Sequence, residues 1–461
     1  MAVPAFADLA VGNVDWQVFA AGSITTIFLG AATALSTRML DISLSLKQGF
    51  MLTTLAWVVL PLAGAIPFVY ADLKLGIIDS IFETVSAMTT TGSTVMVGLD
   101  SMPPGILLWR SLLQWIGGIG IIVMAIAILP FLRVGGMQLF RTESSDRYDK
   151  ALPRAGQMVA AITYVYAGLT VACGLSYWAA GMTAFDALNH ALTTLPTGGF
   201  STHDASFGYF ESPLIQWLGT LFMIAGALPF TLYIATLAGR RKALLRDSQV
   251  RLFLGLAVGS TLLLTAHLVW TRGFGVEEAL RLSAFNLVSV ITTTGFATTD
   301  YGTWGPFAAT LVFYLTFVGA CAGSTTGGIK MLRVGIMVAT FSSYIKRLVY
   351  PAGVFQRRFG GQEISAEVTA SVMVFTLAFA GTIAVTALAL SLFGHDFVTS
   401  LTAAATAVAN VGPGLGPIVG PAGNFAPLEP GAKLVLCAAM ILGRLEIFTV
   451  FVLFSPVYWR G

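Results

Sequence analysis

The chain has 461 residues, of which 56% are hydrophobic and only 10% are charged. Soluble domains usually carry about 25% charged residues, so this composition excludes a soluble enzyme or a soluble binding module. Several apolar stretches exceed the roughly 20 residues that a helix needs to cross a bilayer, and together they predict an all-α polytopic membrane protein.

The formal net charge is only +3, but the basic residues are unevenly distributed. Most of them fall in alternate connecting segments, in particular 133–154, 240–251 and 330–358. The positive-inside rule assigns these segments to the cytoplasmic side. Orientation in the membrane accounts for the basic loops, so no nucleic acid is predicted as a partner.

Three cysteines, Cys173, Cys321 and Cys437, stand far apart in apolar segments, and the four histidines do not show the spacing of metal ligands. An odd number of scattered cysteines argues against a disulfide framework. The sequence therefore predicts neither a disulfide-linked fold nor a covalently bound cofactor.

Apolar segments divide the chain into an N-terminal part and four similar units. Residues 1–47 contain one predicted transmembrane helix, at 16–37. Each unit is expected to contain a long apolar helix, a shorter segment that runs into a glycine-containing loop, and a second long helix. The predicted pore units are 48–132, 133–238, 239–349 and 350–461, and the second long helix of the third unit is interrupted.

The middle segment of each unit is too short to cross the membrane. At about 12–16 residues, it fits a re-entrant helix that enters and leaves on the same side. Non-helical backbone at this depth is tolerated only where it faces protein or a water-filled cavity, so the loops are expected to line an aqueous passage. The four segments are 78–91, 184–197, 277–294 and 396–410.

The glycine loops give the strongest indication of function. They read TTTGST at 89–94, PTGGFS at 196–201, TTTGFA at 292–297 and ANVGPG at 409–414. One such string is typical of many helix ends, but four copies at matching places indicate re-entrant pore loops whose backbone carbonyls surround a central ion pore. The candidate selectivity-filter residues are Thr90, Thr91, Gly92, Thr197, Gly198, Gly199, Thr293, Thr294, Gly295, Asn410, Val411 and Gly412.

Three further runs complete a resemblance to a known family. They are WIGGIG at 115–120, GSTTGGIK at 323–330 and GRLE at 443–446. With the four loops, they make the chain similar to the Trk/Ktr/HKT superfamily of potassium and sodium uptake proteins, and most similar to the bacterial TrkH-type subunit. The resemblance covers nearly all of residues 40–461. It implies a pseudo-fourfold pore within one chain, with the filter residues given above.

Two features depart from the pattern of that family. The TrkH branch has two helices before the first unit, whereas this sequence shows one convincing span. The fourth loop has Asn-Val-Gly in place of Thr-Thr-Gly, which makes the ring chemically unequal. All four loops nevertheless contain glycine, which resembles the potassium-permeable pattern of the family. A serine in place of the first glycine would resemble the sodium branch.

The GSTTGGIK run interrupts the second long helix of the third unit. A run of glycines and hydroxyl residues does not hold a helix in lipid unless its neighbours satisfy the backbone. The resemblance implies a flexible barrier below the filter, and a packing kink is the alternative. The predicted gate residues are Gly323, Ser324, Thr325, Thr326, Gly327, Gly328, Lys330 and Arg444.

Arg444 lies in the middle of the last apolar segment, two residues before Glu446. A charge within the membrane predicts a functional role. One role is an electrostatic barrier beneath the filter. The other is structural, as an ion pair with Glu446 or as a contact with carbonyls of the broken helix, and the two roles are compatible.

These expectations converge on potassium uptake, with K⁺ as the transported ion, by a pore-forming multi-pass subunit in the lipid bilayer of the bacterial cytoplasmic (inner) membrane. The resemblance implies a homodimer and a cytoplasmic nucleotide-binding regulatory subunit of the TrkA type. The alternative is a symporter that couples K⁺ or Na⁺ to H⁺ or Na⁺. An enzyme is not expected, because the apolar segments contain no nucleophile–base pair.

Overall fold

The computed structural model describes residues 1–37, 45–73, 75–127 and 155–460. Within these ranges the chain is almost entirely helical, and the only sheet is a two-stranded antiparallel hairpin of β1 (Arg358–Phe359) and β2 (Gln362–Glu363). The predicted all-α class is therefore confirmed. The basic segment 133–154 and the predicted boundary between the first and second units lie outside the described residues.

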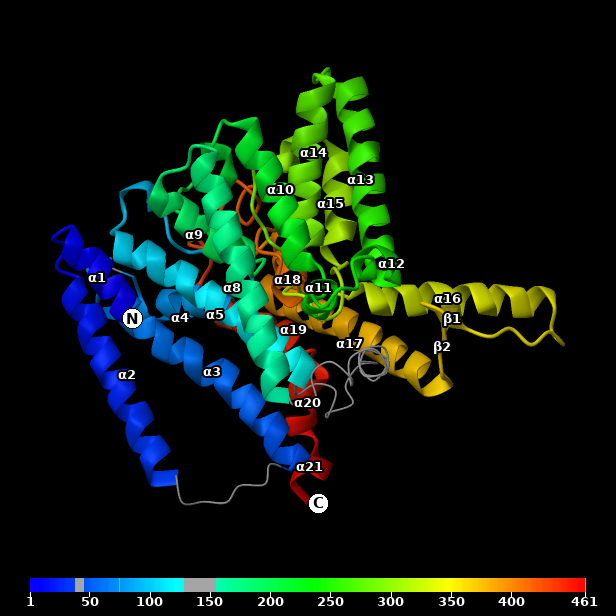
Figure 1. Ribbon diagram of the computed structural model, residues 1–461, viewed down its shortest axis with the longest axis horizontal. Helices are drawn as coiled ribbons and strands as arrows, with labels where there is room; N and C mark the ends of the chain where they lie inside the picture. Colours follow the sequence, from blue (N-terminus) through cyan, green and yellow to red (C-terminus); the bar gives the residue numbers. More distant parts are fainter. Residues whose placement is uncertain (38–44, 74, 128–154, 461) are drawn as a thin grey trace.

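Each of the four predicted ranges contains a long helix, a short helix and a second, often broken, long helix (Figure 1). The first holds α3 (Leu46–Tyr70), α4 (Ile77–Met88) and α5 (Pro104–Ala127). The second holds α8 (Ala155–Ala179), α9 (Ala184–Thr194), α10 (Pro213–Ala227) and α11 (Phe230–Leu237). The third holds α12 (Ala243–Arg246), α13 (Ser248–Arg272), α14 (Val276–Ile291), α15 (Pro306–Thr316) and α16 (Met331–Val349). The fourth holds α17 (Ala366–Ser391), α18 (Phe397–Ala409), α19 (Pro430–Arg444), α20 (Phe448–Phe454) and α21 (Pro456–Arg460).

Six described helices are long and apolar enough to cross a membrane, and two bent pairs bring the number to eight. The short helices α4, α9, α14 and α18 match the four predicted re-entrant segments and run into the glycine loops. Three short 3-10 turns, Leu99–Ser101, Ser206–Tyr209 and Tyr301–Trp304, follow the first three loops. The predicted repeat of helix, re-entrant loop and helix is therefore present in the fold.

Two helices precede the first unit. α2 (Trp16–Thr37) is the predicted span, and it buries only Phe19 and Gly22, so most of its surface is available to lipid. α1 (Ala2–Ala10) was not predicted, because nine residues are too few to cross a bilayer. Its buried Asp8 accepts a hydrogen bond from the Gly105 amide at 2.7 Å, which fastens α1 to the start of α5.

Three second helices are broken, whereas the sequence predicted a break only in the third unit. α10 and α11 meet at 92°, and α19 and α20 meet at 111°. The first bend has a visible cause, since Pro229 lacks an amide hydrogen and holds Leu228 in an extended conformation. The second bend passes through Glu446 and Ile447, both in the left-handed region at φ 62° and 51°.

Close backbone contacts between helices set the position of the short helices. A methyl group placed on Gly117 would lie 2.0 Å from the Met88 carbonyl oxygen, and one on Gly443 would lie 2.0 Å from that of Val408. Gly226 makes the same contact with Leu195 at 2.6 Å. In all three cases the carbonyl belongs to the fourth residue before the loop glycine. Glycine therefore allows the second helix of these units to approach the end of its short helix.

Candidate ion pore and gate

The four glycine loops share one backbone conformation. Thr90, Thr197, Thr293 and Asn410 have φ values of 52°, 54°, 55° and 55°, and each stands two residues before the loop glycine. The glycines themselves, Gly92, Gly199, Gly295 and Gly412, have φ values of 77° to 109°. A left-handed conformation costs a non-glycine residue about 1–2 kcal/mol, so surrounding contacts must hold it in place. Four equal departures from ordinary backbone indicate a shared structural purpose.

Amide groups of each loop hydrogen-bond to the short helix that precedes it. Thr91 N donates to Ser86 O at 2.9 Å, and Gly198 N donates to Thr193 O at 2.9 Å. Equivalent bonds join Thr294 N to Ser289 O at 2.8 Å and Val411 N to Thr406 O at 2.9 Å. The four helices thus end at their loops with part of their last carbonyls satisfied. The partial negative charge of four helix C-termini is directed at the loops, where it favours a cation.

Contacts between neighbouring loops close a ring. A methyl group on Gly92 would lie 2.2 Å from the Gly198 carbonyl oxygen, and one on Gly199 would lie 1.9 Å from that of Thr294. The next contact joins Gly295 to the Val411 carbonyl oxygen at 2.1 Å, and the last joins Gly412 to that of Thr91 at 2.8 Å. Each glycine therefore faces the carbonyl just before the next glycine, and the fourth loop returns to the first. Eight of the twelve candidate filter residues make these contacts, and the other four, Thr90, Thr197, Thr293 and Asn410, directly precede them in the chain.

The ring lies between two small cavities. The outer cavity, of about 80 Å³, is lined by the C-terminal parts of all four loops, together with Arg110, His203 and Asp204. The inner cavity, of about 20 Å³, is lined by Gly323, Ser324, Thr326, Gly327, Gly328, Lys330, Arg444 and Glu446, with Ile121, Phe375, Phe379 and Gly443. A cavity needs about 10–15 Å³ to hold one water molecule, so the inner cavity has room for little more than one.

Side chains next to the ring anchor the loops. The Thr91 hydroxyl lies 2.7 Å from that of Thr89, and Thr294 pairs with Thr292 in the same way at 2.8 Å. Asn410, which replaces threonine in the fourth loop, donates from Nδ2 to Thr91 Oγ1 and to the Met440 carbonyl, both at 3.0 Å. The departure noted in the sequence thus supplies a bridge between the fourth and first loops.

The interrupted helix of the third unit is a loop from residue 317 to residue 330, held by backbone groups of other helices. Cys321 N donates to Ala227 O at 3.3 Å, and Phe230 N donates to Gly323 O at 3.1 Å. Ala322 N donates to Oε1 of Gln249 at 3.0 Å. Neighbours therefore satisfy the broken backbone, as the sequence required.

The same loop is fastened to the underside of the ring. Gly327 N donates to the Thr293 hydroxyl at 2.7 Å, and the Thr197 hydroxyl bonds to that of Thr325 at 3.1 Å. Thr325 Oγ1 also lies 3.1 Å from Leu195 O and 3.0 Å from Gly226 O. The second and third filter loops are therefore in direct contact with the segment predicted to be the gate.

Two basic side chains donate hydrogen bonds to this segment. Arg444 is the last residue of α19 rather than a mid-helix residue, and its Nη1 donates to Thr325 O at 2.9 Å. Lys330 donates from Nζ to the carbonyl oxygen and the hydroxyl of Thr326. Of the two structural contacts considered for Arg444, the one with a carbonyl of the broken helix is present, whereas Glu446 pairs with Arg333 instead.

Sequence reasoning missed three ion pairs in which a buried arginine or lysine meets a carboxylate, within the described part of the chain. They are Arg110 with Glu83, Arg333 with Glu446, and Lys433 with Asp79. Arg333 belongs to segment 330–358, which the charge pattern assigned to the cytoplasmic side, yet all three basic side chains are buried. A charged residue inside an apolar run indicates that a buried partner exists. The partner lies in another helix, so the spacing of residues in the sequence does not identify it.

Four re-entrant loops built by one chain, closed into a ring between two small cavities, define a polytopic membrane protein of the cation-transport class. Comparison with known proteins agrees. The family model described as TrkH, a cation transport protein, matches residues 15–460. The chain belongs to the TrkH family of cation transport proteins, and these are transporters rather than enzymes.

Relatives cover the whole chain. The Trk system potassium uptake protein TrkI of Halomonas elongata is 47% identical, over 100% of this chain and 94% of its own length. TrkH of Escherichia coli is 38% identical over 100% of this chain and 96% of its own length. The crystal structure of the potassium transporter TrkH from Vibrio parahaemolyticus superposes with a TM-score of 0.92 at 37% identity, and covers 99% of this chain and 95% of that one.

Proposed function

We propose that the chain is the pore-forming subunit of a bacterial potassium uptake system of the Trk type, in the cytoplasmic membrane. The observation that carries this proposal is the closed ring, in which each loop glycine faces a carbonyl oxygen of the next loop. The relatives are named as potassium uptake proteins, which supports K⁺ as the transported ion.

Selection of the ion rests on the backbone of the loops. Transfer of a bare ion into an apolar medium costs on the order of tens of kcal/mol, so an uncompensated path through the bilayer is closed to K⁺. Carbonyl oxygens in a ring replace the hydration shell. Residues 90–92, 197–199, 293–295 and 410–412 supply that ring. Successive carbonyls of an ordinary β-strand point in opposite directions, whereas the left-handed residues of these loops change the direction in which successive carbonyls point.

Residues 323–328 form the gate, with Lys330 and Arg444. The inner cavity is too small for a hydrated cation, so the segment must move before ions pass. Within the described residues, Nε and Nη2 of Arg444 have no hydrogen-bond partner, although the side chain is buried. A buried guanidinium that is only partly compensated repels a cation in the same cavity.

Control of this gate is assigned to a partner subunit. A cytoplasmic nucleotide-binding subunit of the TrkA type and a homodimer of the membrane subunit are implied by the family resemblance. The exposed basic turn at Arg240, Arg241, Lys242 and Arg246 surrounds a surface pocket of about 570 Å³ and supports a docking role for this face.

Flux through purified protein in lipid vesicles tests the function. We expect uptake of K⁺ and Rb⁺ down imposed gradients, with much slower uptake of Na⁺. Equal uptake of all three ions would contradict selection by the ring. A reversal potential that follows the K⁺ gradient alone identifies a channel, whereas dependence on the H⁺ or Na⁺ gradient as well identifies the symporter.

A further inference from the structure

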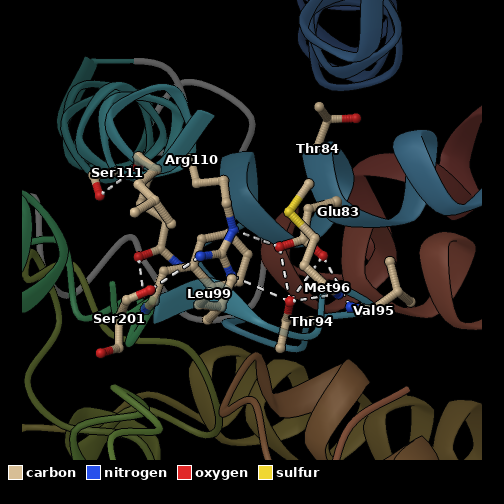
Figure 2. A network of polar contacts seen from close by, with 12 residues as sticks. Glu83, Thr84, Thr94, Val95, Met96, Leu99, Arg110, Ser111 and Ser201 are labelled. Carbon is tan, nitrogen blue, oxygen red and sulfur yellow. Dashed lines mark hydrogen bonds and ion pairs between the residues drawn. The ribbon is translucent and has the colours of Figure 1, made fainter. Parts of the chain in front are cut away.

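A fully buried ion pair lies behind the strands that leave the first and second filter loops (Figure 2). Arg110 of α5 and Glu83 of α4 are 1% and 0% exposed, and Nε of the arginine lies 2.8 Å from Oε1 of the glutamate. A buried ion pair repays its loss of hydration only when the remaining donors and acceptors are also satisfied. Its other partners therefore show what the pair is built to hold.

Arg110 extends from the first unit to the second. Its Nη2 donates to the Thr94 hydroxyl at 3.2 Å, and its Nη1 donates to the Ser201 carbonyl at 3.0 Å. The guanidinium also stacks over the Phe200 ring at 4.1 Å from its centre. Thr94 stands two residues after Gly92, and Phe200 directly follows Gly199. One side chain thus contacts the strands leaving two adjacent loops of the ring.

Glu83 holds the first strand from the opposite side. Its carboxylate accepts hydrogen bonds from the Thr94 hydroxyl, at 2.9 Å and 3.1 Å, and from Val95 N at 2.9 Å (Figure 2). One turn further along α5, Gln114 continues the contact with the second loop. Its Nε2 donates to Gly198 O at 2.7 Å, and its Oε1 accepts from Phe200 N at 3.1 Å.

The other units carry weaker versions of this link. The residue nine positions before the loop glycine is Glu83, His190, Asn286 or Ala403 in the four units in order. His190 lies 2.9 Å from Ser201 Oγ, and Asn286 donates to Thr298 Oγ1 at 2.6 Å. Ala403 has no polar side-chain atom. A charge-assisted network therefore fixes the first unit, neutral groups fix the second and third, and this position contributes nothing in the fourth.

We propose that Arg110 and Glu83 are positioning residues that set the preference for K⁺ over Na⁺ by fixing the outer ends of the first and second loops. The inference rests on the proposed function. Discrimination between two ions of equal charge depends on where the carbonyls are held and how far they yield to the smaller ion. The Thr91 and Gly198 carbonyls belong to the two loops that this pair fixes. Greater mobility at the outer ends of these loops would therefore change the positions of carbonyls in the ring.

A purely structural ion pair would alter the amount of folded protein and leave ion preference unchanged. The permeability ratio PNa/PK, taken from the reversal potential of reconstituted protein between KCl and NaCl, separates the two roles. Arg110→Lys keeps the charge and loses the fork that reaches Thr94 and Ser201 together. Glu83→Gln keeps the shape and loses the charge.

We expect both variants to raise PNa/PK roughly tenfold, the change that about 1.4 kcal/mol of lost discrimination produces. The control is Arg281→Lys, the same substitution in the pair that partly buried Arg281 forms with exposed Glu277 near the start of α14, and it should leave the ratio unchanged. Thr94→Val removes the hydroxyl that joins the pair to the strand and should shift the ratio less, in the same direction.

An unchanged ratio in folded Arg110→Lys or Glu83→Gln protein would overturn the inference. If neither variant is recovered from the membrane, the inference is tested by Thr94→Val alone. An unchanged PNa/PK in that variant would overturn the inference as well. Failure of the proposed function looks different, because the unaltered protein would then show no preference for K⁺ in the same vesicles.

Discussion

The filter loops and the gate segment are both non-helical backbone within the helical bundle, but they are held in different ways. Each filter loop bonds to its own short helix, and the four loops then contact one another backbone to backbone. The gate segment exists once and depends on groups from other units, including hydroxyls and the Arg444 guanidinium. Local bonds repeated four times make a fixed ring. Bonds between separate elements can be exchanged when those elements move, as a gate requires.

The largest expected effect comes from filling the ring. Gly295→Ser places a side-chain carbon 2.1 Å from the Val411 carbonyl oxygen and imposes a φ of 84° on a serine. Overpacking typically costs about 1–3 kcal/mol, and a loss of about 2 kcal/mol in the discrimination between the two ions corresponds to a rise in PNa/PK of roughly 30-fold. Gly92→Ser, at 2.2 Å from the Gly198 carbonyl oxygen, should behave similarly.

A matched control separates backbone strain from the ring. Gly361 also has a φ of 84°, but a methyl group there meets nothing within 4 Å. Gly361→Ser should therefore leave the reversal potential unaltered. An equal shift in Gly361→Ser and Gly295→Ser protein would argue against the filter assignment.

Shortening the segment Gly323–Gly328 tests the other side of the comparison. Removing residues here breaks several of its bonds at once, including those to Thr197 and Thr293. We expect the largest increase in basal K⁺ flux of any gate change, with PNa/PK unaltered because the ring keeps its own bonds. Lower flux in the vesicle assay would contradict a barrier role.

Arg444→Ala removes one bond of the gate and the charge beside the inner cavity. Hydrogen bonds to charged groups contribute about 1.5–3 kcal/mol, so the lower limit predicts a rise of roughly tenfold in basal flux. Arg251→Ala, at an exposed position on α13, is the control. Flux equal to that of the unaltered protein would favour a packing role for Arg444.

Thr325→Val is the smallest change. The valine keeps the branched shape and loses the hydroxyl contacts to Leu195 O, Gly226 O and Thr197. A neutral hydrogen bond contributes about 1 kcal/mol net, so basal flux should rise roughly fivefold. If PNa/PK changed as much as flux, the ring and the gate would not be separate devices.

The repeat of short segment and glycine loop allowed the fold to be predicted, because it depends on local patterns that recur four times. The bend at Pro229 also had a local signal. The bend after Arg444 had none, since Leu445, Glu446 and Ile447 include neither glycine nor proline. Arg333 was therefore not predicted as the partner of Glu446.

The partners of buried charged residues could not be predicted from the sequence, because no local pattern indicates them. Glu83 and Arg110 are 27 residues apart on different helices, and neither segment contains a pattern that predicts contact with the other. The four loops could be recognised as similar, but the order in which each glycine meets the next carbonyl depends on tertiary packing. Sequence therefore supplied the parts of the pore, while their contacts came from the fold.

The central claim is that the four loops surround one dehydrated cation. An experimental structure of the protein in Rb⁺, recorded at a wavelength where Rb⁺ scatters anomalously, tests it most directly. We expect an anomalous peak on the axis of the ring, within coordination distance of carbonyl oxygens from all four loops. Loops that point apart, or a ring without a peak while Rb⁺ binds elsewhere, would contradict the account.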